Sequence, residues 1–132
     1  MNKKTASGFG SNSRTSKKSV NRSKNDLMEL ENKADQFLKK GRIDKSEMLY
    51  IKVVKSNLLK PEPYINLSRI YRHTNRHRKA IEILQKSTIL IKDSINHFIE
   101  LASVFRELNQ NQKSLRCLLE AIEIEPQNQN LL

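Results

Sequence analysis

The residues best suited to chemistry are two histidines and one cysteine. His73 and His77 are four residues apart, a spacing at which two imidazoles on one helix face can share a metal ion. A turn is predicted at Asn75, between them, and His97 lies elsewhere in the repeat pattern described below. We therefore expect histidines in a hydrated turn and no metal site. The single Cys117 excludes an internal disulfide, and we expect an unreactive thiol on a helix.

The segment 72–79 is strongly basic, with four arginine or lysine side chains and both of these histidines. It is interpreted either as an exposed turn or as a local anion site at the rim of the fold. The chain has neither a glycine-rich phosphate loop nor a paired-cysteine metal motif. We therefore expect a non-enzymatic protein without a cofactor.

These residues belong to a pattern that recurs every 34 residues. Equivalent large positions, repeat by repeat, are Leu30, Phe37 and Tyr50; Tyr64, Tyr71 and Leu84; and Phe98, Phe105 and Leu118. Self-similarity at this period is typical of a helix–turn–helix solenoid, in which stacked hairpins bury each other's apolar faces. We expect a domain over 26–132 with repeats at 27–60, 61–94 and 95–128.

Small residues are predicted where the two helices of each hairpin cross closely. The pairs are Ala34 with Ser46, Ser68 with Ala80, and Ala102 with Ser114. The tight turns require residues that tolerate a left-handed backbone, and Gly41, Asn75 and Asn109 fit that need.

Helices are predicted at about 26–40, 44–58, 61–74, 78–91, 95–108 and 112–125. The pairs Asp26–Glu29 and Asp44–Glu47 are interpreted as capping boxes that open the first two helices. Pro61 is expected in the first turn of the third helix.

Residues 1–25 form a basic segment rich in Ser, Lys and Asn. They hold seven of the net +11 charges and no acid, which leaves +4 on residues 26–132. We expect a disordered tail. Four roles stay open: a hydrated tail without a partner, an arm for nucleic acid or another polyanion, a transit peptide, or a linker-like leader. No run of 18 apolar residues predicts a membrane span, and a cytoplasmic location is expected.

The repeat pattern resembles the tetratricopeptide repeat family. The middle repeat carries the resemblance at Tyr64, Leu67, Ser68, Tyr71, Asn75, Ala80, Leu84 and Ser87, and the last at Phe98, Leu101, Ala102, Phe105, Asn109, Ser114, Leu118, Ala121 and Pro126. The first repeat departs from the pattern at Lys33 and Leu58, where leucine and proline are usual. The resemblance implies an all-α, right-handed α-solenoid of three repeats with six helices.

The resemblance also implies a concave groove on the first helices of the hairpins, which would bind a peptide or a partner helix. The likeliest contacts are Asn66, Arg69, Arg72, His73, Ile99, Ser103 and Arg106. Further groove positions are Glu31, Asp35, Leu38, Ile65 and Glu100. The family's carboxylate clamp for chaperone tails is not expected, because acidic side chains and Asn96 stand where it needs Lys, Asn and basic residues. A hydrated polar face without a ligand is the alternative.

Leu115, Leu119 and Ile122 fall at i, i+4 and i+7 along the last predicted helix, near the end of the chain. We expect this face to be partly uncovered and to serve in self-association, partner docking or contact with further chain. The favoured function is a protein-interaction scaffold. The alternatives are an N-terminal module of a larger glycosyl- or sulfotransferase-type enzyme, and polyanion association through the tail.

Overall fold

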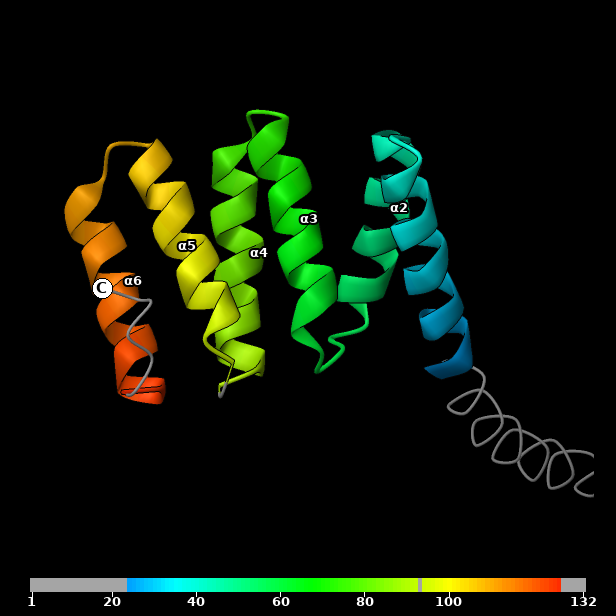
Figure 1. Cartoon of the computed structure of the whole chain (residues 1–132). Coiled ribbons are helices and arrows are strands. Elements are labelled where there is room, and N and C mark those ends of the chain that lie inside the picture. Colours follow the sequence, from blue (N-terminus) through cyan, green and yellow to red (C-terminus); the bar gives the residue numbers. More distant parts are fainter. Residues whose placement is uncertain (1–23, 93, 127–132) are drawn as a thin grey trace, which may run out of the picture.

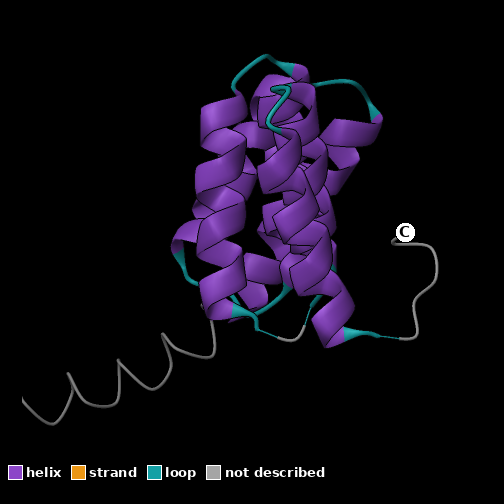
Figure 2. Cartoon of the chain, turned by 90° about the vertical axis from the view of Figure 1, so that its left-hand side faces the viewer, coloured by secondary structure: helices purple, strands orange, loops and turns teal. Residues whose placement is uncertain are grey.

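The structure, a computed structural model, describes residues 24–92 and 94–126. Within these ranges it contains six helices and no strand (Figure 2). Residues 24–39 are helical, and they are followed by α2 (Ile43–Lys55), α3 (Pro61–His73), α4 (His77–Leu90), α5 (Asn96–Glu107) and α6 (Asn111–Ile124). Successive helices run antiparallel and form three hairpins that stand side by side (Figure 1). The predicted all-α solenoid is confirmed.

The turn inside each hairpin has the same left-handed geometry. The φ angles are +76° at Gly41, +61° at Asn75 and +59° at Asn109. In each turn the next residue donates its N–H to the carbonyl five positions back, for example from Arg76 to Tyr71 at 2.7 Å. This bond closes the preceding helix with a Schellman motif. The predicted turn residues are confirmed, while Asn57 (φ +57°), between α2 and α3, was not predicted.

Two of the three predicted pairs of small residues are joined by a hydrogen bond across the helix crossing. In the middle pair Ser68 and Ala80 are both buried, but Ser68 Oγ donates to the Ile65 carbonyl of its own helix. Ser46 Oγ donates to the Ala34 carbonyl at 2.9 Å, and Ser114 Oγ donates to the Ala102 carbonyl at 2.8 Å. The hydroxyl therefore satisfies a buried carbonyl while its small size lets the backbones approach.

The core extends through all three hairpins. Its largest fully buried side chains include Tyr50 of the first hairpin and Tyr64, Leu67 and Leu84 of the second. The aromatic rings of the three repeats share one contact, because Lys45, Lys79 and Lys113 lie 5.5, 5.8 and 5.7 Å from the centroids of Phe37, Tyr71 and Phe105. None of the described helices is long and apolar enough to cross a membrane.

Two predictions about helix starts are wrong. Residue 24 is already helical, so Asp26 lies inside the first helix rather than at its cap. The N-cap of α2 is Arg42, which makes no side-chain cap bond. Glu47 does not close a capping box, because its carboxylate pairs with Arg76 of the next hairpin. Pro61 begins α3 as predicted. The predicted tail lies outside the described residues except for residues 24 and 25, which are helical.

Candidate functional site

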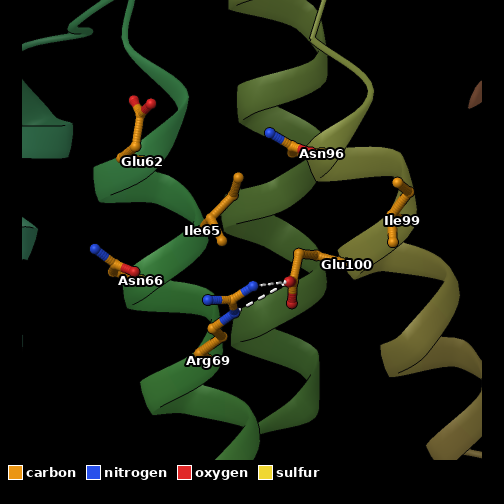
Figure 3. A pocket seen from close by; sticks show the side chains of 7 residues that line it. All are labelled: Glu62, Ile65, Asn66, Arg69, Asn96, Ile99 and Glu100. Atoms are coloured by element: carbon orange, nitrogen blue, oxygen red, sulfur yellow. Dashed lines mark hydrogen bonds and ion pairs between the residues drawn. The ribbon is translucent and has the colours of Figure 1, made fainter. Parts of the chain in front are cut away.

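A hollow of ≈ 340 Å³ lies between α3 and α5, the first helices of successive hairpins. Its lining comes from these two helices alone: Glu62, Ile65, Asn66 and Arg69 of α3, and Asn96, Ile99 and Glu100 of α5 (Figure 3). The stacking of repeats brings equivalent positions together here, since Glu62 and Asn96 differ by one repeat, as do Ile65 and Ile99. Each helix therefore contributes one isoleucine and one asparagine to the lining, together with charged side chains.

A buried carboxylate closes one side of the hollow. Arg69 Nε donates to Glu100 Oε1 at 3.0 Å, and Arg72 Nη1 donates to Glu100 Oε2 at 3.2 Å. The Glu100 side chain is only 11% exposed, whereas that of Arg69 is 52% exposed. Charge-assisted bonds of this kind compensate the desolvation of a buried carboxylate. Two arginines predicted to contact a partner are therefore already paired within the chain.

Asn66 connects the hollow to the first hairpin. Its Nδ2 donates to Tyr50 Oη at 3.2 Å, and the Tyr50 hydroxyl in turn donates to Asp35. Burial and the Asp35 carboxylate raise the pKa of Tyr50, so the phenol stays protonated as the donor to Asp35. This chain of bonds fixes the Asn66 amide. Its Oδ1 makes no hydrogen bond within the described residues.

The acidic groove positions of the first repeat also have partners. Glu31 is buried and lies 2.8 Å from Lys60 Nζ, and Asp35 accepts the Tyr50 hydroxyl. The Glu31 carboxylate raises the pKa of Lys60 by accepting its hydrogen bond. The acidic charge expected at this end is therefore partly neutralised inside the chain.

The structure brings three of the predicted contacts, Asn66, Arg69 and Ile99, into the hollow. Arg72 does not line the hollow but donates a hydrogen bond to Glu100, which does. The remaining predicted contacts do not line it: His73 and Arg106 are exposed elsewhere on α3 and α5, and Ser103 Oγ donates to the Ile99 carbonyl at 3.2 Å.

Glu62 and Asn96 line the hollow but were not among the predicted contacts. The repeat pattern could have identified them, because both occupy the first turn of the first helix in successive repeats. The predicted set started one position after the large residue, Tyr64 or Phe98, and so began too late on each helix.

The other residues singled out for chemistry lie apart from the hollow. His77 Nε2 is 2.9 Å from Glu107 Oε2, and burial raises the pKa of the half-buried Cys117 thiol. No cluster of three potential metal ligands occurs among residues 24–92 and 94–126. On α6, Leu115 and Leu119 are 56% and 50% exposed, and Ile122 is half-buried.

The tetratricopeptide repeat model matches residues 61–90 and 98–128. These are the second and third predicted repeats, and the divergent first repeat lies outside the match. Over 66 residues, half of this chain, the sequence is 33% identical to the BBSome complex member BBS4 homolog of Drosophila melanogaster. The match covers 14% of that protein's length.

Solved structures with the same arrangement of helices include three different proteins. The first TPR of Spaghetti (RPAP3), bound to the HSP90 peptide SRMEEVD, has a TM-score of 0.69 at 16% identity, covering 80% of this chain and 83% of that one. A crystal structure of MamA has a TM-score of 0.70 at 18% identity, covering 87% and 67%. The Yersinia enterocolitica translocator chaperone SycD has a TM-score of 0.69 at 10% identity, covering 79% of each chain. With two matched repeats, equivalent turns and this common fold, the chain belongs to the tetratricopeptide repeat family.

Proposed function

We propose that this protein is an interaction scaffold that binds an extended segment of a partner protein in the hollow between α3 and α5. The observation that carries the proposal is one hollow lined by an isoleucine and an asparagine from each of two successive first helices. Ile65 and Ile99 suit an apolar side chain of the segment, and Asn66 and Asn96 suit its backbone, because an amide both donates and accepts hydrogen bonds.

The charges of the hollow favour a neutral or basic segment over an acidic one. Glu100 already accepts hydrogen bonds from Arg69 Nε and Arg72 Nη1, so its negative charge offsets one of the two guanidinium charges. Glu62 adds an exposed carboxylate that has no ion-pair partner within the described ranges. An acidic segment would meet repulsion from Glu62 in a partly desolvated hollow.

The similar RPAP3 domain is bound to a peptide with two glutamates and an aspartate. At the positions where the family's carboxylate clamp would need Lys, Asn and basic residues, the present chain holds Glu31, Asp35, Asn96 and Glu100. We therefore propose a different ligand class for this hollow: a segment anchored by an apolar side chain and without an excess of acid.

Selection of binding peptides from a random library with the full chain as bait tests the proposal. Selected peptides are expected to share one apolar position with few acidic neighbours. Ile99→Glu replaces an apolar lining side chain with a charge and should weaken their binding by about tenfold or more, measured as Kd by fluorescence anisotropy.

The matched control is Ile89→Glu, because Ile89 of α4 is 74% exposed and does not line the hollow. This variant should keep the wild-type affinity, and circular dichroism should show both variants folded. Selected peptides that bind the folded Ile99→Glu protein as tightly as wild type would refute the proposed site.

A further inference from the structure

A second hollow, of ≈ 530 Å³, lies away from the proposed site, where α4 meets the turn between α5 and α6. Its apolar lining is formed by Ile81 of α4, the Phe105 ring and Leu108. Gln110 and Lys113 line the side formed by the third hairpin.

At the preceding hairpin contact, polar side chains fill the equivalent place. Arg76 Nη1 donates to Glu47 Oε2 at 2.9 Å, and Arg76 Nε donates to Thr74 Oγ1 at 2.9 Å. The guanidinium carbon of Arg76 also lies 4.8 Å from the centroid of the Tyr71 ring. Arginine, glutamate and threonine thus form a polar plug between the first two hairpins.

Every member of this plug is replaced one repeat later. Shifted by 34 residues, Glu47 becomes Ile81, Thr74 becomes Leu108 and Arg76 becomes Gln110. The aromatic ring is retained as Phe105, with Lys113 5.7 Å from its centroid. The side chain of Gln110 makes no hydrogen bond within the described residues. The second contact therefore keeps the ring but exposes an apolar floor where the first has an ion pair.

The charge at one position of the rim is reversed as well, while the lysine of the rim is retained as Lys113 in place of Lys79. The position of Asp44 in the first repeat is taken by Arg78 in the second. Arg78 and Lys113 are exposed, line the hollow and form no ion pair within the described ranges. Glu82 supplies one opposing carboxylate, and the neighbouring Glu107 is paired with His77 and Arg72. The rim is therefore net positive around an apolar floor.

We propose that this second hollow binds a partner segment in which one bulky apolar side chain is flanked by acidic residues. The apolar side chain would contact Ile81, Leu108 and the Phe105 ring, in the space that the Arg76 side chain fills one repeat earlier. The flanking carboxylates would pair with Arg78 and Lys113. This charge preference is opposite to that proposed for the hollow between α3 and α5, and neither proposal depends on the other.

Three capped pentapeptides serve as probes: phenylalanine flanked by two glutamates on each side, the same peptide with alanine at the centre, and phenylalanine flanked by lysines. Binding is followed by backbone amide shifts of the isotope-labelled full chain. The first peptide should produce saturable shifts at Ile81, Leu108 and Lys113. The other two should bind about tenfold more weakly or not at all, because one lacks the bulky apolar side chain and the other lacks the flanking carboxylates.

The decisive variant combines Ile81→Glu with Gln110→Arg, which rebuilds the ion pair of the preceding hairpin contact. It should fill the hollow and weaken binding of the first peptide by at least about tenfold. A second variant, Arg78→Glu with Lys113→Glu, changes only exposed residues, so it tests the charged rim even if the first variant folds poorly. It should also lose the acidic peptide and gain affinity for the lysine-flanked one.

Ile89→Glu is the matched control, because Ile89 is exposed on α4 and lines neither hollow, and it should leave binding of the acidic phenylalanine peptide unchanged. The absence of saturable shifts at millimolar concentrations of that peptide would overturn the proposal. So would equal binding of the phenylalanine and alanine peptides, or unchanged affinity in the charge-reversed variant.

Discussion

A histidine and a serine form a buried polar pair between α4 and α5. His97 Nδ1 lies 3.0 Å from Ser87 Oγ, and both residues are fully buried. One repeat earlier the same positions hold Val53 and Pro63, which are buried and apolar. Burial lowers the pKa of the imidazole, and the nearby Ile91 backbone offsets part of that effect. The native state therefore holds His97 neutral.

This pair should make the protein sensitive to mild acid. The unfolded chain protonates His97 near pH 6.5, whereas the native state does so only at lower pH. Stability should therefore fall as the pH drops below 6.5 and level off below the native pKa. Between pH 7.5 and 5.5, urea unfolding should show the wild type losing about 1 kcal/mol more than His97→Gln.

His73→Gln is the control, because His73 is exposed at the end of α3. This variant should keep the pH dependence of the wild type. If His97→Gln lost as much stability as the wild type over the same range, His97 would not be the group that titrates.

At the scale of elements, the helix positions follow from the sequence because the turn residues and small residues recur at one period. Gly41, Asn75 and Asn109 mark the turns, and the helices begin and end within about one turn of the predicted positions. The caps at the helix starts were less predictable. A capping box is predicted from residues that are close in sequence. Glu47 instead binds Arg76, which lies 29 residues further along the chain.

The Arg76–Glu47 pair should hold the first two hairpins together. Arg76 pairs with Glu47 and stacks on Tyr71, so Arg76→Ala should lower the free energy of unfolding by about 1 kcal/mol. Arg76 lowers the pKa of Glu47 through a hydrogen bond. The stabilisation should therefore be present above pH 4.5 and be lost as the pH falls through the lowered native pKa.

Arg42→Ala is the matched control for this pair. Arg42 precedes α2 as Arg76 precedes α4, is exposed and forms no ion pair within the described residues. Its removal should change the unfolding free energy by less than about 0.5 kcal/mol in urea titrations at pH 7. Equal losses in the two variants would show that the Arg76–Glu47 contact contributes nothing specific.

At the scale of the whole molecule, the candidate site depends on how the hairpins are stacked. The repeat pattern predicted that Asn66, Arg69 and Ile99 face a common groove, and the structure places all three in one hollow. The contacts of Arg69 and Arg72 with Glu100 could not be predicted. The two arginines lie 31 and 28 residues before Glu100 in the sequence, and the rotation between hairpins decides whether they meet it. Charge at a groove position therefore does not establish that the charge is available to a ligand.

If the hollow between α3 and α5 binds an extended partner segment, the amides of its lining residues should respond to that segment. The most direct test is a titration of the isotope-labelled full chain with a library-selected peptide, read as amide shift changes along the chain. We predict saturable changes concentrated at Ile65, Asn66, Asn96 and Ile99, and their loss in Ile99→Glu. Saturable changes confined to α2 or α6, with these four amides unmoved, would contradict the proposal.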